Sequence, residues 1–527
     1  MRQLSSELNG KLNQLGTGTV QETVQQLRQI GQSGVYAAIP VMLRMMDHEC
    51  ADIRRAAEQA VTRLLAVCPV SELVWLNEHV REWRPSPVDR KRVVEREMHT
   101  MDQASTIRLS MLTMHWSGYI REAAVKRMIR EGESYSFAYL LLRLNDWVPE
   151  IRNLARAALE RKQTPEYAKL WMEHIILVER LRICGRDSFE SFIESVHHLL
   201  RQKECRYVLH TARVSPEPGI RRLAFRISME AEGTDTEMLM EQALRDEDPS
   251  IRRWAAQRVD RMLSGQKLRE VLLRMQMDSV PSIRRESLDV LATMYPADAR
   301  EIIMDRLLDS NLSVRDTARR HAKPWMKVNY AEWYLDAIWS EGQDHLAAAL
   351  AGLGETGEKA DAEVLFEYAQ HPSVAVRKAV IRGLMRLDAI SYGNYFICSL
   401  RSPQPGISRE ACRALMRHPY LIKPDEAAVL LSGADVLPHV IRNVLRIISA
   451  MGRWTQLGLL LQQLPTAKQE WVKRTIQRQL HNWAQFPNRS YGGRMSTAER
   501  ERLHTQLSLC RQELDSDLLQ RLEWLIQ

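Results

Sequence analysis

The sequence contains few of the residues that interrupt helices. Its 527 residues include only 23 glycines and 20 prolines. Scarce chain breakers are typical of many helices joined by short turns. Hydrophobic residues account for 45% of the chain and charged residues for 27%, which is the balance of a folded soluble protein.

The features of secreted and membrane proteins are also missing. The first residues include no apolar run of the kind found in a signal peptide, and no apolar stretch approaches the length that crosses a bilayer. We therefore expect a cytoplasmic protein that contacts no membrane. The cysteines are few and scattered without a C-x-x-C pair, which predicts small buried side chains in a reducing compartment. They are Cys50, Cys68, Cys184, Cys205, Cys398, Cys412 and Cys510.

Sequence motifs of catalysis are scarce as well. The chain has no Gly-x-x-x-x-Gly-Lys-Ser/Thr phosphate loop and no Gly-x-Ser-x-Gly nucleophile turn, and no dinucleotide-binding loop is predicted. These absences favour a binding protein over an enzyme.

Arginine, by contrast, is in excess. The formal net charge is +8, from 74 Lys and Arg against 66 Asp and Glu, and 14 lysines leave 60 arginines. A guanidinium group binds oxyanions through paired hydrogen bonds. The excess therefore points either to phosphate recognition or to internal ion pairs.

One short pattern recurs along most of the chain: an aspartate, four residues, and then Ile or Val followed directly by Arg. An alanine often stands three residues after that arginine. The four strict copies are Asp146 to Arg152, Asp246 to Arg252, Asp278 to Arg284 and Asp309 to Arg315. Looser copies place the equivalent basic residue at Arg54, Arg121, Arg221, Arg377, Arg409, Arg442 and Lys473.

The spacing of these copies indicates a structural repeat. The steps after Arg221 are 31, 32 and 31 residues, and the steps after Arg377 are 32, 33 and 31. Wider gaps of 67, 69 and 62 residues precede Arg121, Arg221 and Arg377. Each wide gap is about two repeats long, which predicts degenerate repeats near residues 87, 187 and 347.

A period of about 31 residues accommodates two helices and two turns. Apolar residues at helical spacing precede and follow each polar turn, and prolines such as Pro149 and Pro249 occupy the first turn of second helices, where no N–H is needed. We predict an all-α protein, an α-solenoid of about 14 helix pairs. Its predicted parts are an N-terminal capping helix in 1–18, repeats in 19–480, a Gly/Arg loop in 481–495 and C-terminal capping helices in 496–527.

The repeat resembles the HEAT-repeat family, and its short period resembles the bacterial kind called phycobilisome-lyase-like HEAT repeats. The resemblance covers about residues 20–480. It implies that repeat arginines and turn aspartates pair within and between neighbouring repeats as a structural ladder. The residues that it assigns to this ladder are Asp146, Arg152, Asp246, Arg252, Asp278, Arg284, Asp309 and Arg315.

Two enzyme classes are also built on HEAT-like repeats, and the sequence favours neither. Hydroxylases of the deoxyhypusine type bind iron through several His-Glu pairs, whereas His48-Glu49 is the one such pair here and is interpreted as part of a turn. DNA glycosylases present Trp and Asp on a basic concave face. Trp116, Trp147 and Trp254 are near repeat turns but are interpreted as packing residues. We predict no metal site, no cofactor and no catalytic residue.

The residue after each ladder arginine is predicted to face solvent, which places Glu410 and Asn443 on the surface. In the middle of the chain, the residue at this position is an arginine in three consecutive repeats. Because successive repeats stack about one helix diameter apart, these arginines would form a stripe roughly 20–30 Å long. The stripe is either a surface for nucleic acid or an acidic partner, or a solvated face neutralised by nearby acids. It consists of Arg222, Arg253 and Arg285, with Arg258 and Arg261 expected one and two turns further along the helix of Arg253.

A weaker candidate is the loop 487–494, in which Arg489 and Arg494 could grip a phosphate, although a linker is the simpler interpretation. The predicted function is a non-enzymatic scaffold that binds another protein along the solenoid surface. The alternative is a protein that binds the nucleic-acid backbone through the arginine stripe, as the pI of about 9.1 suggests. The modest net charge of +8 places this alternative second.

Overall fold

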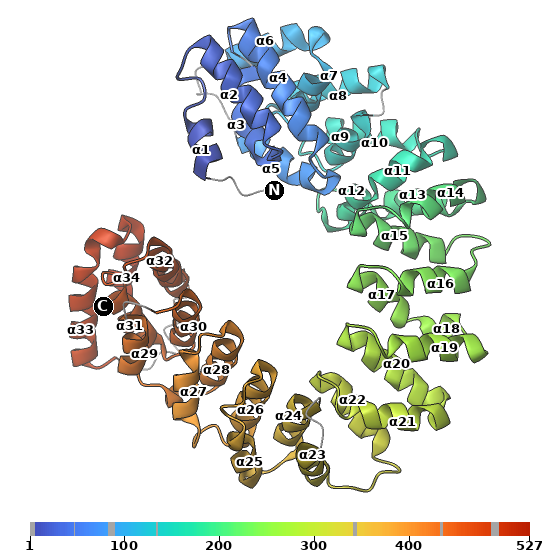
Figure 1. The fold of residues 1–527 in the computed structure, drawn as a ribbon. Coiled ribbons are helices and arrows are strands. Elements are labelled where there is room, and N and C mark those ends of the chain that lie inside the picture. The colour runs from blue at the N-terminus through green and yellow to red at the C-terminus, as the bar shows by residue number, and fades with distance from the viewer. Residues whose placement is uncertain are drawn as a thin grey trace. The chain divides into compact units, whose positions relative to one another are not determined.

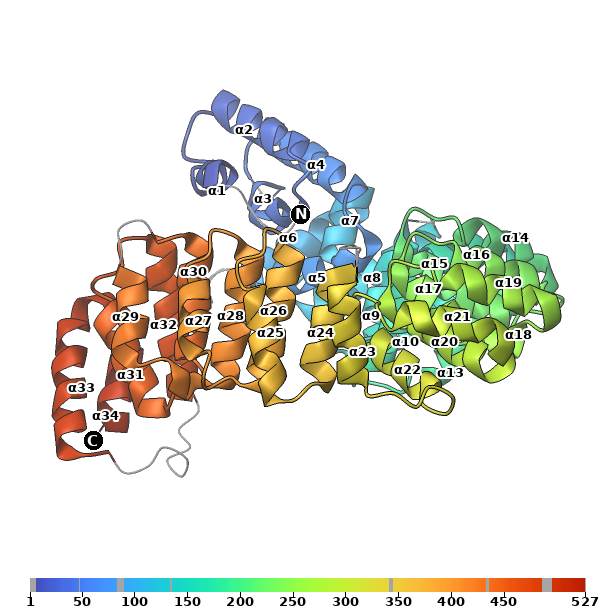
Figure 2. The ribbon, with the colours of Figure 1, turned by 60° about the horizontal axis from the view of Figure 1, so that its bottom comes forward.

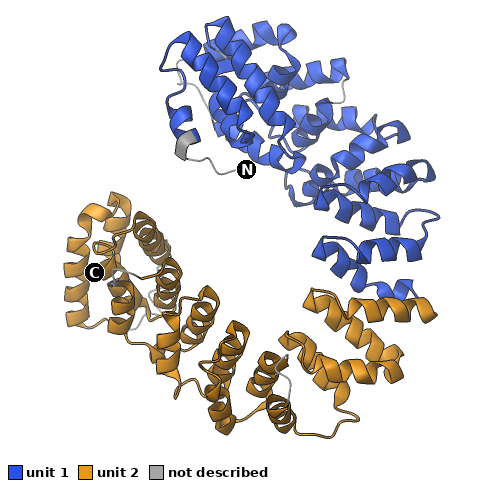
Figure 3. Ribbon diagram, in the orientation of Figure 1, with its two compact units in different colours: residues 1–263 blue, residues 264–527 orange. Residues whose placement is uncertain are grey.

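The computed structural model describes residues 6–46, 48–82, 90–132, 135–340, 345–432, 436–485 and 495–526. Within these ranges the chain consists of α-helices, short 3-10 turns and connecting segments, and no strand is present. The chain divides into two compact units, residues 1–263 and 264–527 (Figure 3).

The α-helices of unit 1 follow one another at short intervals (Figure 1). They are α1 Ser6–Asn13, α2 Val20–Gln32, α3 Ile39–Met46, α4 Ala51–Ala66, α5 Leu73–Glu82, α6 Arg90–Thr100, α7 Thr106–Leu112, α8 Gly118–Glu131, α9 Ser136–Arg143, α10 Pro149–Glu160, α11 Ala168–Glu173, α12 Ile175–Arg180, α13 Glu190–Arg201, α14 Arg206–Ala212, α15 Pro218–Met229, α16 Thr236–Leu244, α17 Pro249–Ala256 and α18 Val259–Met262.

Unit 2 continues in the same manner, and Figure 2 shows its later helices standing side by side. Its helices are α19 Gly265–Met275, α20 Pro281–Met294, α21 Pro296–Arg306, α22 Leu312–Ala322, α23 Tyr330–Trp339, α24 Leu346–Thr356, α25 Ala362–Glu367, α26 Val374–Leu387, α27 Gly393–Leu400, α28 Pro405–Arg417, α29 Pro424–Ser432, α30 Pro438–Ile448, α31 Arg453–Gln463, α32 Glu470–Gln485, α33 Thr497–Leu509 and α34 Ser516–Ile526.

The helices of each unit form two layers. The first helix of a repeat packs on the second, as in α9 on α10, α16 on α17, α21 on α22 and α27 on α28. Second helices then stack on one another in chain order, as in α8 on α10, α15 on α17, α20 on α22 and α26 on α28. This arrangement is the predicted α-solenoid of helix pairs, and the all-α prediction is confirmed.

The repeat pattern explains these pairs locally. Pro149, Pro249 and Pro281 are the first residues of α10, α17 and α20, where a helix needs no N–H donor. The alanine three residues after the repeat arginine, for example Ala155 or Ala255, is fully buried. Its small side chain allows second helices to approach one another closely.

Several boundaries differ from the sequence expectations. Helix α32 continues to Gln485, so residues 481–485 are helical and not loop, because Trp483 and Ala484 pack in the core. Residues 486–494, with Arg489 and Arg494, lie outside the described residues. The degenerate repeat near residue 187 contains a short helix, α12, between its first helix, α11, and its second helix, α13.

The cysteines are less uniformly buried than predicted. Cys205, Cys412 and Cys510 are buried, but Cys398 is exposed because it lies on the face of α27 opposite Phe396 and Leu400, which point into the core. The remaining three are half-buried, and all seven are free thiols.

Candidate functional site

In nine repeat turns of the described chain, one side chain accepts the backbone N–H two residues further on. In the strict repeats this acceptor is the signature aspartate, with Oδ1 to N distances of 2.7–3.1 Å. Five of the looser copies use a histidine Nδ1 or a serine Oγ instead, which explains why the aspartate of the motif is missing there. These substitutes are His48, His115, Ser215, His371 and Ser402. His48 is therefore a turn residue, as interpreted from the sequence.

The repeat arginine stabilises the same turn from the other side. Its Nη1 donates to the main-chain carbonyl six residues earlier, as from Arg152 to the Asp146 carbonyl at 2.8 Å. Within a repeat, then, the arginine binds the aspartate's carbonyl and not its carboxylate. The same contact is made by Arg54, Arg121, Arg221, Arg252, Arg284 and Arg315.

The carboxylate pairs belong to neighbouring repeats. Arg221 binds both carboxylate oxygens of Asp246 at 2.9 Å, and Arg284 binds both of Asp309 at 2.7 and 2.8 Å. Each pair joins residues 25 positions apart. Arg315 departs from this pattern and binds the buried Glu355, which Arg319 also contacts. Much of the arginine excess is thus used inside the fold.

The sequence assignment of Arg409 and Arg442 to the ladder is wrong. Both side chains are exposed, and Ser408 occupies the ladder position, where its Oγ accepts a hydrogen bond from Asn443 Nδ2 at 2.9 Å. The position after the ladder residue is therefore displaced by one residue as well. Glu410 and Asn443, expected in solvent, are 4% and 7% exposed, and Glu410 pairs with Arg382 and Arg413.

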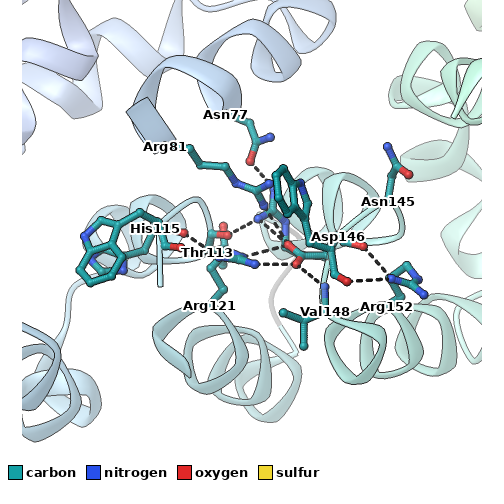
Figure 4. Close-up of polar contacts among 12 residues, drawn as sticks. Asn77, Arg81, Thr113, His115, Arg121, Asn145, Asp146, Val148 and Arg152 are labelled. Carbon is teal, nitrogen blue, oxygen red and sulfur yellow. Dashed lines mark hydrogen bonds and ion pairs between the residues drawn. The ribbon is translucent and has the colours of Figure 1, made fainter. Parts of the chain in front are cut away.

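At Asp146 the ladder becomes a cluster (Figure 4). Arg121 binds both carboxylate oxygens at 2.7 and 3.0 Å, as the repeat predicts. Arg81 from α5 and Arg143 from the end of α9 also contact Oδ2, at 2.8 and 3.1 Å. Three guanidinium groups therefore share one carboxylate.

Burial intensifies the electrostatics of this cluster. Burial by itself would raise the pKa of Asp146, but the hydrogen bonds from Arg121 and the charges of the three arginines outweigh it and hold the pKa well below its usual range. For Arg143, which is 1% exposed, burial and the charge of Arg81 lower the pKa, and Asp146 offsets this in part. The cluster therefore has more positive charge, from three guanidinium groups, than the single carboxylate of Asp146 neutralises.

The cluster borders a pocket of about 320 Å³ in unit 1. Helix α5, the end of α9 with its following turn, and the region of α12 form its walls. The sequence drew attention to Trp147 at this place but missed the basic residues around it. These are Arg81, Arg143, Arg180 and Arg186.

His115 provides a pH-dependent element beside the cluster. Its Nδ1 accepts the Ser117 N–H at 3.1 Å, which requires an unprotonated Nδ1. Burial lowers the pKa of His115 to about 4, and the nearby charges of Arg121 and Arg108 act in the same direction against that of Glu97. Since the folded pKa lies below the unfolded value near 6.5, the unfolded chain takes up a proton first as the pH falls.

We therefore expect the free energy of unfolding to decrease as the pH falls from about 6.5 to about 4, by at most about 1.4 kcal/mol per pH unit from this histidine. Replacing His115→Asn keeps an acceptor in the turn and removes the titration. Urea unfolding at several pH values should show a shallower slope for this variant. An identical slope in both proteins would assign the effect to other groups.

Two arginines of the predicted stripe lie near acidic side chains. Arg222 lies 3.6 Å from Asp248 in unit 1, and Arg285 lies 3.9 Å from Glu286 in unit 2. Arg253 and Arg261 are exposed.

Arg258 does not continue the helix of Arg253, contrary to the sequence expectation. Helix α17 ends at Ala256, and the Arg258 N–H turns to the Ala255 carbonyl. The Arg258 side chain then donates to the Trp254 carbonyl at 3.0 Å and stacks on the Trp254 ring, so it does not extend the stripe.

A second hollowed region of unit 1 lies along α11, α14 and α16, which are the first helices of three repeats. Helices α11 and α14 border a hollow of about 380 Å³, and α14 and α16 border another of about 820 Å³. Both hollows are lined by Ser215 and Pro216. Tyr207, Val214 and Met238 line this region, which we call the α14 groove, and are 62%, 64% and 65% exposed.

One glycine pattern escaped the sequence analysis. Gly352, Gly354 and Gly357 spell Gly-x-Gly-x-x-Gly, but they lie in and directly after helix α24 and follow no strand in the described chain. A dinucleotide loop needs a strand before it. Here the glycines allow helix contact: a Cβ on Gly354 would lie 2.4 Å from the Gly383 Cα on α26.

No family model and no curated protein matches the sequence. Among solved structures, importin beta shares 11% identity over 99% of this chain and 67% of its own, with a TM-score of 0.30. A chain of the Kap95:Nup1 complex shares 11% over 98% and 80%, at 0.36. A chain of the Schizosaccharomyces pombe condensin Cnd3-Cnd2 subcomplex shares 10% over 98% and 90%, at 0.30.

Two further observations concern metals and membranes. Within the ranges that the structure describes, no group of three or more His, Cys, Asp or Glu side chains could hold a metal ion. No single described helix has the length and apolar character to cross a membrane, although the bent pair Ala51–Ala66 and Val70–Glu82 would pass by length and composition together.

Proposed function

We propose that the chain is a non-enzymatic scaffold that binds a segment of another protein in the α14 groove. The observation that carries this proposal is the cluster of exposed apolar side chains, Tyr207, Val214 and Met238, over two adjoining hollows. Contiguous exposed apolar surface in a folded domain is typical of a protein-binding site.

The groove also indicates the chemistry of the partner. Arg213 is half-buried in the wider hollow, makes no ion pair among the described residues, and its buried Nε–H has no acceptor there. Burial lowers the pKa of Arg213, as expected for a charge without compensation. A partner segment with apolar side chains and one carboxylate placed at Arg213 would satisfy both features.

Nucleic-acid binding is less well supported. A phosphate backbone is held by cations that lack acidic partners. Two of the three stripe arginines have acidic neighbours, and the α14 groove mixes Arg245 with Glu241 and Glu247. This mixed charge suits a protein segment better than a polyanion.

Affinity purification from the native host tests the proposal. We expect the wild-type bait to retain a partner protein after nuclease treatment, and the double variant Tyr207→Glu with Met238→Glu to lose it. Both residues are exposed, so the bait should fold normally. Arg213→Gln should weaken the purified complex by about tenfold or more, because it removes a charge-assisted hydrogen bond.

The matched control is Ile183→Glu with Ile390→Glu, which introduces the same charges at exposed apolar positions outside the groove. This control should retain the partner. Retention by the groove variant would exclude the groove, and recovery of only nuclease-sensitive material would exclude the protein scaffold.

A further inference from the structure

The pocket beside Asp146 contains more positive than negative charge. Four of its lining residues are arginines, and Glu78 is its acidic lining residue. Glu78 lies 3.8 Å from Arg180, and both side chains are exposed. Asp146, at the base of the cluster, is already shared by Arg81, Arg121 and Arg143. Arg81 and Arg143 thus line the pocket, and the carboxylate that they bind is shared with a third guanidinium group.

Three residues that line the pocket have a buried side-chain atom without a hydrogen-bond partner in the described chain. The Nε–H groups of Arg81 and Arg143 are buried and have no acceptor within the described part of the chain. The buried Oδ1 of Asn145 likewise has no donor there. Arg143 is otherwise fixed by Thr113, Asn77 and Asp146, so it cannot turn away to find solvent. Buried donors of this kind are costly unless a partner binds them.

An aromatic side chain stands at the mouth of the pocket. Trp147 is 70% exposed, and the guanidinium of Arg186 lies 5.0 Å from its ring centroid. Arg186 is held in this place by a hydrogen bond of 2.9 Å to the Asn145 carbonyl. The mouth thus combines a cation with a flat apolar surface.

From this arrangement we infer that the pocket binds a small phosphate monoester. A phosphate dianion supplies two negative charges and several acceptors in a small volume, which matches the excess of guanidinium groups around the pocket. A carboxylate supplies one charge and two oxygens. The ester group of the ligand would extend toward Trp147 and Arg186. About 320 Å³ accommodates a phosphate with a sugar-sized or ring-sized group.

This site is independent of the α14 groove, because it lies on α5, α9 and α12 and shares no lining residue with that groove. Failure of either proposal therefore leaves the other unaffected.

Isothermal titration calorimetry with phenyl phosphate, benzoate and inorganic phosphate tests the inference on the full chain. Phenyl phosphate and benzoate present the same ring with a dianion or a monoanion. We expect phenyl phosphate to bind at one site and about tenfold or more tighter than benzoate, with inorganic phosphate between them or weaker than both. The double variant Arg180→Gln with Arg186→Gln should weaken phenyl phosphate about tenfold or more.

Arg180 and Arg186 are exposed, so this variant should fold, and Arg130→Gln, on the exposed face of α8, is the matched control. The control should bind as the wild type does. Three results would overturn the inference: no phenyl phosphate binding at millimolar concentration, benzoate binding as tightly as phenyl phosphate, or undiminished binding by the Arg180 and Arg186 variant.

Discussion

Replacing Asp146→Ala is expected to lower the free energy of unfolding of unit 1 by about 3–5 kcal/mol. The change removes the carboxylate that three arginines share, and two of them, Arg121 and Arg143, are almost completely buried. It also removes the acceptor that closes the turn at Val148 N–H. Urea unfolding would measure the loss, and hydrogen exchange should place it first in α8 to α10.

Asp102→Ala is the control for this prediction. Asp102 also pairs with an arginine, Arg130 at 3.4 Å, but both side chains are exposed, so solvent screens the pair. We expect no measurable change in stability. If Asp146→Ala were as mild as Asp102→Ala, the cluster would contribute little to the fold.

Replacing Gly354→Ala should destabilise unit 2 by about 3 kcal/mol. Its new Cβ would lie 2.4 Å from the Gly383 Cα, and a backbone atom cannot move aside without separating α24 from α26. The gain in helix propensity from Gly to Ala, about 1 kcal/mol, offsets only part of this cost. Thermal and urea unfolding would both report the change.

Gly458→Ala in α31 is the matched substitution in the same unit. The nearest atoms to its added Cβ are at 3.5 Å, an ordinary van der Waals distance. We expect it to be neutral or to stabilise by about 0.5–1 kcal/mol through the unfolded chain and helix propensity. Equal stability of the two variants would show that α24 and α26 can separate without cost.

The sequence predicts the parts of the fold that depend on local periodicity. The step of about 31 residues between copies of one pattern identifies the helix pairs, because each pair must present the same apolar stripes. The aspartate and arginine of the turn are visible for the same reason. Arg221 with Asp246 and Arg284 with Asp309 could be placed at neighbouring turns from spacing alone.

A shift of one residue in the alignment of a repeat with the pattern is harder to detect from the sequence. Arg409 was assigned to the ladder because it falls at the expected step, although Ser408 occupies that position. A signal for the correct alignment was present in the sequence: Ala411 stands three residues after Ser408, at the spacing that Ala155 and Ala255 keep from their arginines. Burial of Ala411 confirms that alignment.

The pocket could not be predicted, because its residues obey no repeat. Arg81 and Asp146 are 65 residues apart, and Arg143 and Asn77 are 66 apart. Nothing in the sequence around Arg81 distinguishes it from other surface arginines. Arg81 and Arg143 join Arg121 at Asp146 only because α5, α9 and the turn before α10 pack together, which is a property of tertiary structure.

The direction of the ladder has a consequence for synthesis on the ribosome. In three bidentate pairs the arginine binds an aspartate 25 residues closer to the C-terminus, so about one further repeat of nascent chain completes each pair. Such short-range closure suits vectorial folding, in which repeats are added to a folded end as they emerge. Two arginines have later acceptors: Arg81 binds Asp146, 65 residues on, and Arg315 binds Glu355, 40 residues on. Ribosomal pausing before Asp146 would leave Arg81, Arg121 and Arg143 without the carboxylate that they share.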